Sequence, residues 1–204
     1  MSDDATVLDI GAGTGKLTRV LADRYARVIA LEPGQELRAI LAARVSGAEL
    51  LAGVAERIPL ADGEVDAVFA GQSFHWFAND VALAEIARVL RPGGVLAMMW
   101  NVPAEPSPLP DAYVRRIEEL HEAMRPPPID ENLFDGAPFG ELREAEVEHE
   151  QISSREEVLA AAASVSWIIS RDDREQVLAE LAAMLPEGEY RLPIRMELGW
   201  RIRE

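Results

Sequence analysis

Asp9 and three alternating glycines form the group of residues best suited to bind a reactive cofactor. They occur in V-L-D-I-G-A-G-T-G, which runs from Val7 to Gly15. The apolar residues before Gly11 are typical of a buried strand, and those after Lys16 recur with helical spacing. Glycines at such a strand-to-helix turn let the backbone bend tightly and approach a ligand. The segment therefore predicts the binding site of a nucleoside cofactor.

The spacing of the glycines separates the cofactor classes. A dinucleotide fingerprint, G-x-G-x-x-G, would place its third glycine at Lys16, whereas here the third glycine is Gly15. A phosphate-binding P-loop would need glycine in place of Ile10 and serine or threonine in place of Leu17. Both phosphate-binding patterns are therefore poor matches. A turn that needs glycine for its geometry alone is the structural alternative.

Glu32 is a second candidate for cofactor binding. It ends the second expected strand, where Pro33 halts strand pairing. A carboxylate there can accept hydrogen bonds from both hydroxyls of a ribose, an arrangement that NAD enzymes share. A helix cap or a solvated acid is the alternative interpretation.

His75 is the candidate for acid–base chemistry. It lies in A-G-Q-S-F-H-W-F, from Ala70 to Phe77, directly after another expected strand. An ordinary histidine pKa of about 6.5 suits a general base, although the residue could instead hydrogen-bond the loop and shape the pocket. The aromatic residues around it predict either an apolar wall near the reacting group or packing at a helix entry: Phe74, Trp76 and Phe77.

The remaining candidates are weaker. His121 and His149 lie in charged contexts and are expected to face solvent, whereas Tyr113 and Trp167 are candidates for the substrate side. No cluster of histidines and carboxylates has metal-ligand spacing, so no metal site is expected.

Composition limits the function classes. The chain has 204 residues and a mass of 22.4 kDa, enough for about one domain with a core. Its formal charge of -16 repels phosphate backbones, so a nucleic-acid substrate is not expected. The absence of cysteine excludes disulfides and cysteine nucleophiles. Since neither a leader nor an apolar run of about 18 residues is seen, we expect no membrane span and a cytoplasmic location.

The elements that must position these groups alternate between strand and helix through the first half of the chain. Strands are expected at 6–10, 27–31, 49–54, 65–70 and 95–100, and helices at 16–24, 36–45 and after the cap residues Asn79 and Asp80. The last of these helices is expected to bury Val81, Ile86, Val89 and Leu90 and to stop at R-P-G-G, 91–94. This alternation predicts an α/β fold, a parallel sheet with helices on both faces.

The later half has a different character. Residues 103–140 are expected to form a loop and helix insertion over the substrate side, with a helix at 111–124. Strands are expected at 143–152 and 195–202. Two further helices are expected from capping-box spacing: Ser153 with Glu156, and Asp172 with Glu175. The whole chain, 1–204, is expected to be a single domain.

These motifs together resemble the class I methyltransferases that use S-adenosylmethionine (SAM), in particular their type 11 branch. The resemblance also rests on two further segments: G-V-A-E-R-I-P-L-A-D-G, at 53–63, and A-L-A-E-I-A-R-V-L-R-P-G-G-V-L-A-M-M-W-N, at 82–101. The F-H-W-F element is similar to a subgroup related to trans-aconitate methyltransferase. The resemblance is strong over residues 5–101 and weak in the C-terminal segment L-P-I-R-M-E-L-G-W-R-I-R, at 192–203. It implies a Rossmann-like fold whose seven-stranded, mostly parallel sheet has an antiparallel edge strand.

The resemblance implies SAM as the cofactor, with S-adenosylhomocysteine as the product. It assigns the methionine end, the ribose and the adenine to successive cofactor-binding positions: Asp9, Gly11, Ala12, Gly13, Thr14, Gly15, Glu32, Pro33, Ala55, Glu56, Ala70 and Gly71. The positions that would face the transferred methyl group are Gln72, Ser73 and Trp76, with His75 as base or pocket residue.

We therefore expect an enzyme of the EC 2.1.1 class that transfers a methyl group to an unidentified small molecule by in-line displacement. A non-catalytic SAM-binding protein, or one that acts only with a partner, is the alternative from another class. An NAD-dependent oxidoreductase is disfavoured by the early third glycine and by the segment at Ala55 and Glu56. A monomer and a homodimer are both open.

The start of the chain differs from the type 11 pattern. Relatives commonly place helices before the first strand, over the cofactor, whereas here the first strand begins at about residue 5. This N-terminal cap is therefore expected to be missing. Cover over the site would then come from the loop at 124–140, from a partner, or from a longer form of the chain.

Overall fold

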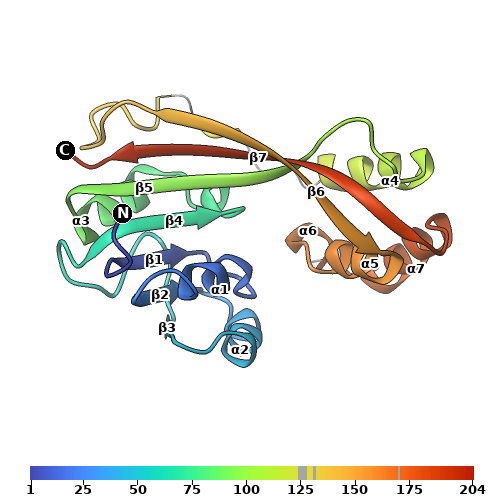
Figure 1. The fold of residues 1–204 in the computed structure, drawn as a ribbon, viewed down its shortest axis with the longest axis horizontal. Helices are drawn as coiled ribbons and strands as arrows, with labels where there is room; N and C mark the ends of the chain where they lie inside the picture. The colour runs from blue at the N-terminus through green and yellow to red at the C-terminus, as the bar shows by residue number, and fades with distance from the viewer. Residues whose placement is uncertain (124–127, 131, 170) are drawn as a thin grey trace. The chain divides into compact units, whose positions relative to one another are not determined.

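The computed structural model describes the chain except for residues 124–127, 131 and 170. Strand and helix alternate in the first half: β1 (Thr6–Ile10), α1 (Lys16–Ala22), β2 (Arg27–Leu31), α2 (Gln35–Arg44), β3 (Ala48–Leu51), β4 (Val65–Gly71), the short helix η1 (Phe74–Trp76), α3 (Asp80–Val89) and β5 (Leu90–Pro103). The second half contains α4 (Asp111–Glu122), β6 (Arg143–Ser154), α5 (Arg155–Ala163), α6 (Ser166–Ile169), α7 (Arg174–Met184) and β7 (Glu189–Ile202) (Figure 1).

The strands form one seven-stranded sheet in the order β3-β2-β1-β4-β5-β7-β6. The first five pair in parallel. Strand β7 runs antiparallel to β5: Ala104 N, just after β5, donates to Pro193 O of β7 at 2.9 Å, and Arg203, just after β7, exchanges bonds of 2.9 and 2.8 Å with Gly93 and Gly94 of β5. The predicted mixed sheet with antiparallel pairing at one side is confirmed, and the antiparallel strand β7 lies between β5 and the edge strand β6.

Alternate residues of β1 pack against helices on opposite faces of the sheet. Val7 belongs to the apolar cluster that includes Leu17 and Leu21 of α1. Leu8, its neighbour, belongs to the cluster that includes Leu83 of α3. Because successive strand residues point to opposite faces, this division shows that the sheet is covered on both sides, as the sequence predicts.

The parallel register brings the ends of several strands to the same edge of the sheet. Ile10, the last residue of β1, pairs with Leu31, the last of β2, and Leu31 pairs with Leu51 of β3. Asp9 pairs with Phe69 near the end of β4. The segments that follow these strands therefore start close together, which is the usual position of a ligand site in a parallel α/β sheet.

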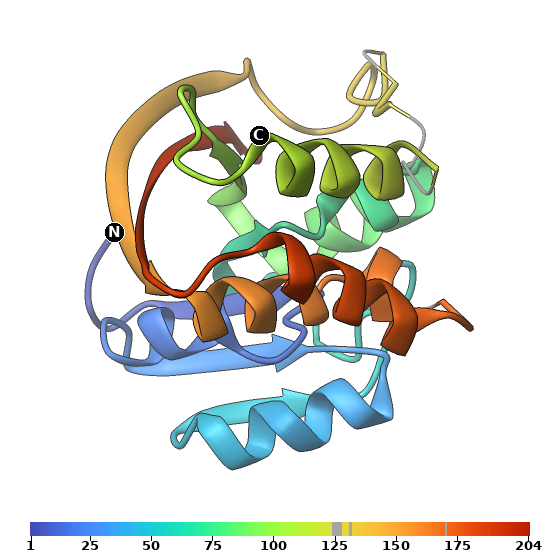
Figure 2. The same cartoon turned by 90° about the vertical axis from the view of Figure 1, so that its right-hand side faces the viewer.

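The chain divides into two compact units. The first comprises Met1–Trp100, Pro127–Ala145 and Glu197–Glu204, and the second comprises Asn101–Pro126 and Glu146–Met196. Helices α4, α5, α6 and α7 of the second unit share an apolar core that includes Tyr113, Val158, Ile168 and Leu181 (Figures 1 and 2). The sequence pattern predicts helices here but does not indicate that they build a separate compact unit.

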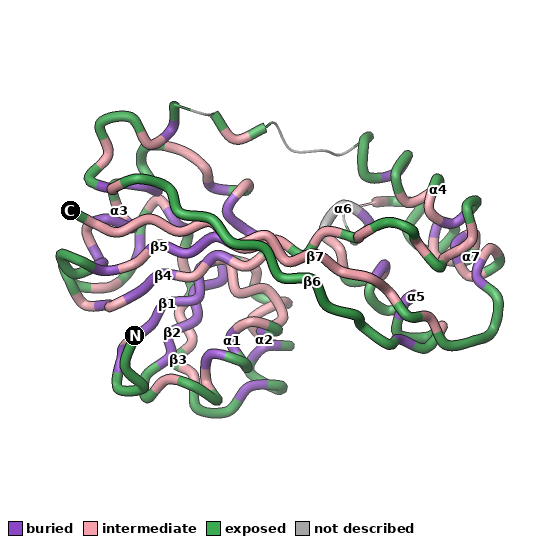
Figure 3. Tube along the Cα trace, turned by 45° about the horizontal axis from the view of Figure 1, so that its top comes forward, coloured by how far each residue is buried: buried purple, intermediate pink, exposed green. Residues whose placement is uncertain are grey.

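Several local predictions were wrong. Val81 is 58% exposed, because α3 turns Ala82, Leu83 and Ile86 toward the core instead. The strand predicted as half-exposed, β6, is exposed along almost its whole length (Figure 3), since it lies at the sheet edge. Strand β5 begins at Leu90 and continues through R-P-G-G, where only a stop was predicted.

The two capping predictions also differ from the structure. Helix α5 has its capping box at Ser154 and Glu157, one residue later than predicted, because Ser153 is still part of β6 and its Oγ accepts a 2.9 Å hydrogen bond from Gln151. At α7, Asp173 is the cap residue, but its carboxylate pairs with Arg171 at 2.7 Å instead of capping the helix.

Other predicted features fall outside the described residues. The predicted lid at 124–140 and the end of the predicted helix at Met124 lie partly there, and the side chain of Trp167 is not described. Among the helices in the described part of the chain, none is long and apolar enough to cross a membrane.

Candidate functional site

The glycine loop follows β1 directly and is fixed to the end of β2. Gly11 N and Ala12 N both donate to Leu31 O, at 2.9 and 3.1 Å. Gly15 has a φ of 83°, and a Cβ there would lie 2.8 Å from Leu41 Cγ and 2.9 Å from Val45 Cγ2. Gly13 differs, because a Cβ there would meet no described atom within 4 Å. Gly15 is therefore required by packing, whereas Gly13 faces open space in which a ligand could lie.

Asp9 is a buried carboxylate beneath this loop. Its Oδ2 accepts a 2.6 Å hydrogen bond from Thr18 Oγ1 of α1. Burial raises the pKa of Asp9 to about 6, the hydrogen bonds from Thr18 oppose the rise, and the negative charge of Glu32 adds to it. A cationic group brought beside Asp9 would favour its ionised form.

Glu32 lies at the end of β2 with its carboxylate turned back toward the glycine loop. Its Oε2 accepts a 2.9 Å hydrogen bond from Gly13 N, and its Oε1 accepts a 2.8 Å hydrogen bond from Gly34 N. A carboxylate offers about four lone-pair positions, so both oxygens keep capacity for hydroxyl donors. Pro33, beside it, is exposed, and its carbonyl accepts from Arg38 at 2.6 Å.

The segment after β3 is joined to the start of α3. Glu56 Oε1 accepts a 2.9 Å hydrogen bond from Asn79 Nδ2, and the Asn79 Oδ1 caps α3 by accepting from Ala82 N at 3.0 Å. Ala55 is buried in the core beside Ile58. The sequence identified Asn79 as a helix cap but not as the partner of Glu56.

The loop after β4 continues the same edge of the sheet. Gln72 is a non-glycine residue with a φ of 56°, a conformation seen mainly at special positions. Its backbone N donates to Met99 O at 2.9 Å. Ser73 is buried, and its Oγ donates to Ile10 O at 2.8 Å, which ties this loop to the end of β1. Ala70 is buried, and a Cβ on Gly71 would lie 2.9 Å from Leu17 Cδ2.

The aromatic residues of F-H-W-F divide between the core and the surface. Phe74 and Phe77 are buried and pack edge to face with their ring centroids 5.6 Å apart, so they are core residues and not a pocket wall. Trp76 is 55% exposed and His75 is half-buried, and their ring centroids are 5.0 Å apart. His75 and Trp76 are therefore the accessible side chains of this turn.

Thr18 is a site residue outside the set that the sequence motifs predict. It is buried on the face of α1 toward the sheet, where its hydroxyl meets Asp9. A buried hydroxyl needs a hydrogen-bond partner, so a threonine within the apolar stripe of a helix that follows an aspartate-bearing strand was an available signal.

The other predicted candidates lie elsewhere. Tyr113 is buried in the core of the second unit, and that burial raises its pKa. His121 is exposed on α4, and His149 is exposed on β6. Within the described residues, no group of three or more histidines, aspartates and glutamates could hold a metal ion.

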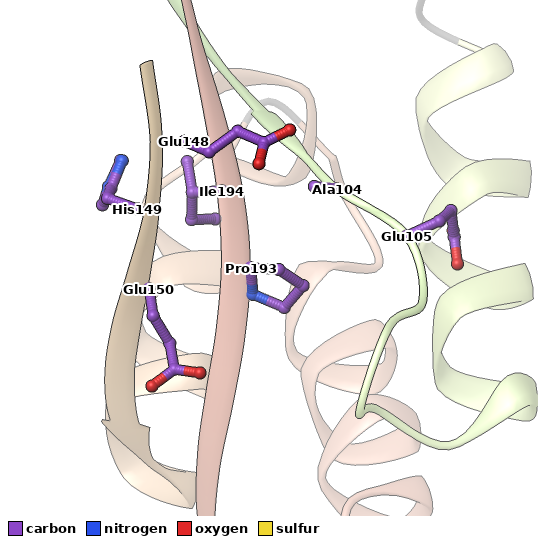
Figure 4. Close-up of a pocket in the computed structure, with 7 residues that line it drawn as sticks. All are labelled: Ala104, Glu105, Glu148, His149, Glu150, Pro193 and Ile194. Atoms are coloured by element: carbon purple, nitrogen blue, oxygen red, sulfur yellow. The ribbon is translucent and has the colours of Figure 1, made fainter.

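A hollow of about 270 Å³ occurs in the second unit. It is lined by Ala104, Glu105, Glu148, His149, Glu150, Pro193 and Ile194 (Figure 4). Glu148 and Glu150 extend toward β7, whereas the intervening His149 turns away, as expected for alternating strand residues. Glu150 is paired with Arg191 at 2.9 Å. None of these lining residues is among the predicted cofactor positions.

Comparison with known proteins identifies related sequences. Residues 8–98 match a family profile described as a methyltransferase domain, and this range contains all the predicted cofactor positions. The chain is 35% identical over 189 residues to an uncharacterised methyltransferase of Schizosaccharomyces pombe, a match that covers 89% of this chain and 74% of that protein. It is 37% identical over 164 residues to an uncharacterised methyltransferase of Mycobacterium tuberculosis, covering 80% of this chain and 65% of that protein.

Solved structures with low sequence identity show the same fold. The YcgJ protein from Bacillus subtilis matches with a TM-score of 0.63 and 16% identity over 99% of this chain and 93% of that chain. The geranyl diphosphate C-methyltransferase from Streptomyces coelicolor matches with a TM-score of 0.58 and 14% identity over 100% of this chain and 74% of that chain. That structure contains S-adenosylhomocysteine and geranyl diphosphate.

Proposed function

Because the chain belongs to the class I SAM-dependent methyltransferases, we propose that the segments after β1, β2, β3 and β4 bind SAM for methyl transfer to a small molecule. The observation that carries the proposal is the arrangement of Asp9, Gly13 and Glu32 at one edge of the sheet. The open side of Gly13 leaves space for a ligand, and the Glu32 carboxylate beside it has unused acceptor capacity.

The described residues fit the parts of SAM in order. Asp9 would bind the cationic amino group of the methionine end. Burial disfavours the ionised form of its carboxylate, and a positive charge beside it would offset that effect. Glu32 would accept hydrogen bonds from the ribose hydroxyls. Ala55 and Glu56 would border the adenine, and the backbone of Ala70 and Gly71 would lie along the methionine portion.

Bound SAM would supply a methyl group on a positively charged sulfur, which an acceptor can displace in line. The chain then has to hold the acceptor at contact distance and exclude water, which supplies much of the rate in such reactions. Gln72, His75 and Trp76 are accessible on the turn after β4 and are the residues we assign to the acceptor side. Ser73, the fourth predicted position, is buried and donates to Ile10 O, so we do not assign it there. His75 would take the proton of a hydroxyl or amine acceptor, whereas a carboxylate acceptor would need no base.

A small acceptor is favoured over a nucleic acid by charge. The chain carries a formal charge of -16, which opposes the approach of a phosphate backbone. We therefore propose a small organic acceptor, with no nucleic-acid or membrane partner.

Calorimetric titration with SAM, S-adenosylhomocysteine and NADH tests the cofactor assignment. We expect the first two to bind and NADH not to bind. Binding of NADH alone would support an oxidoreductase, and binding of none of the three would contradict the proposal. A screen of hydroxyl, amine and carboxylate acceptors, read by formation of S-adenosylhomocysteine, then tests catalysis. Cofactor binding without transfer to any acceptor would favour the non-catalytic alternative.

A further inference from the structure

The segment between β3 and β4 is held in place by an ion pair on α3. Arg88 and Glu85 lie one turn apart, with Arg88 Nε 2.7 Å from Glu85 Oε1 and Arg88 Nη2 2.8 Å from Glu85 Oε2. The two parallel contacts make this a bidentate pair, the strongest geometry for arginine and a carboxylate.

The same two side chains form hydrogen bonds with backbone groups of the segment. Glu85 Oε2 accepts a 2.9 Å hydrogen bond from Ile58 N, and Arg88 Nη2 donates to Ile58 O, also at 2.9 Å. Arg88 Nη1 donates to Leu60 O at 2.8 Å. The backbone donor and acceptor of Ile58 are thus both bound by one ion pair. The segment also has backbone bonds of its own, since Leu60 N donates to Ile58 O at 2.8 Å and Arg57 N donates to Val54 O at 3.1 Å. The ion pair adds the bonds that tie this backbone to α3.

Two further contacts close the segment against α3. Gly63 N donates to Arg88 O at 2.8 Å, and Asn79 at the start of α3 binds Glu56. Arg88 also meets Asp62 at 2.8 Å, but Asp62 is 82% exposed, so this pair contributes little. The hydrogen bonds to Glu85 raise the pKa of Arg88, and those from Arg88 lower the pKa of Glu85, consistent with a pair that stays charged.

We propose that Arg88 and Glu85 are positioning residues that preorganise the segment at Ala55 and Glu56 for the adenine of the cofactor. The inference rests on the proposed function, since that function assigns the adenine to this segment. A segment already fixed in its bound path loses less conformational freedom on binding, which strengthens affinity without a direct contact. The role follows from the bonds to Ile58 and Leu60, beside the residues assigned to the adenine.

The test compares Arg88→Met with Arg91→Met. Arg91 lies three positions further along the chain and pairs with Asp66 at 2.7 Å, whereas Arg88 pairs with Glu85 and with the exposed Asp62. Both variants therefore remove one positive charge, and Arg91→Met does so without touching the segment between β3 and β4. The probes are S-adenosylhomocysteine and 5′-methylthioadenosine, which lacks the amino-acid end. Calorimetry is done well below the unfolding temperature of each variant.

We expect Arg88→Met to weaken both probes by a similar factor, about tenfold, because both contain adenine. Arg91→Met should stay within about twofold of the parent chain. Arg88→Lys should fall between the parent and Arg88→Met, because lysine keeps the charge but not the planar fork. Glu85→Gln combined with Arg88→Met should cost less than the sum of the two changes, since the residues act as one pair.

Three outcomes would overturn the inference. Unchanged affinity for both probes despite a lower unfolding temperature would mean that the pair only stabilises the fold. Loss of S-adenosylhomocysteine binding with unchanged 5′-methylthioadenosine binding would place the effect at the other end of the cofactor. An equal loss in Arg91→Met would show a general effect of charge. Failure of the parent chain to bind either probe would instead refute the proposed function, before any variant is compared.

Discussion

Thr18 Oγ1 donates a 2.6 Å hydrogen bond to Asp9 Oδ2, and both side chains are buried. The bond joins the end of β1 to α1 on the far side of the glycine loop. It stabilises the ionised form of Asp9, but burial has the larger effect, and the pKa of Asp9 is raised to about 6. Asp9 therefore carries a charge at neutral pH at a cost to the fold.

Stability should depend on the ionisation of Asp9. The folded pKa of about 6 lies above the ordinary value of 3.8, so the folded state holds the proton more tightly than the unfolded state. The contribution of Asp9 to the free energy of unfolding is therefore greatest below about pH 4 and falls as the pH rises to about 6, by roughly 3 kcal/mol. Urea denaturation of the parent and of Asp9→Asn from pH 4 to 8 should show the variant gaining relative stability over this interval. If the free energies of unfolding of the parent and of Asp9→Asn changed in parallel with pH, the raised pKa of Asp9 would be contradicted.

Affinity for S-adenosylhomocysteine should rise with pH over the same interval. A cationic amino group beside Asp9 requires the carboxylate, so below about pH 6 binding must release its proton. We expect about a tenfold gain in affinity from pH 5 to 7. The proton that Asp9 releases on binding is taken up by the buffer, so the heat of binding should depend on the buffer used. In Asp9→Asn the pH dependence should disappear. With 5′-methylthioadenosine, which lacks the amino group, the parent chain should show a flat profile, and a slope of equal size there would contradict the prediction.

Two glycines of the loop should respond differently to alanine. Gly15→Ala places a Cβ 2.8 Å from Leu41 and should lower the free energy of unfolding by about 2 to 4 kcal/mol through overpacking and a positive φ. Gly13→Ala meets no described atom within 4 Å and should cost about 1 kcal/mol for its backbone conformation alone. Gly13→Ala should nevertheless weaken S-adenosylhomocysteine, because the added methyl enters the proposed ligand space. Urea denaturation measures the stability of both variants, and calorimetry measures their affinity for S-adenosylhomocysteine. A larger loss of stability in Gly13→Ala than in Gly15→Ala would contradict the prediction.

Glu32 should matter for both the fold and the ligand. Glu32→Ala removes the acceptor of Gly13 N and Gly34 N, and we expect it to weaken S-adenosylhomocysteine by about 1 to 3 kcal/mol. Glu32→Gln keeps one oxygen acceptor and should have a smaller effect on the unfolding temperature than Glu32→Ala. Calorimetry measures the affinity, and unchanged affinity in Glu32→Ala would remove Glu32 from the ribose site.

Local patterns in the sequence predicted that the first five strands exist, although β3 ends at Leu51 and β5 spans Leu90–Pro103, which differ from the predicted 49–54 and 95–100. The bounds of β1 and β2 agree with the prediction, because runs of apolar residues end there at glycine or proline. The common edge for Asp9, Glu32 and Gln72 also follows from the strand order of a parallel α/β sheet. The roles of these residues toward a cofactor stay predictions.

Features that depend on contacts between distant residues could not be predicted from local patterns. The sequence contains two overlapping frames with capping-box spacing at the start of α5, and the choice of Ser154 depends on how far β6 continues. The apolar residues of α3 allow Val81 to be placed on the buried stripe, but the packing of Leu83 and Ile86 against the sheet sets the rotation that exposes it.

The sequence by itself determined the family, the alternation of strands and helices in the first half and the glycine turn, because these depend on residue type and spacing along the chain. Helix α6 was not predicted. Tertiary structure alone decided that Thr18 binds Asp9, that Glu32 spans Gly13 and Gly34, and that the Arg88 and Glu85 pair holds Ile58. The physical reason is that a buried polar group must find a partner within hydrogen-bond distance, and folding determines which distant residue supplies it.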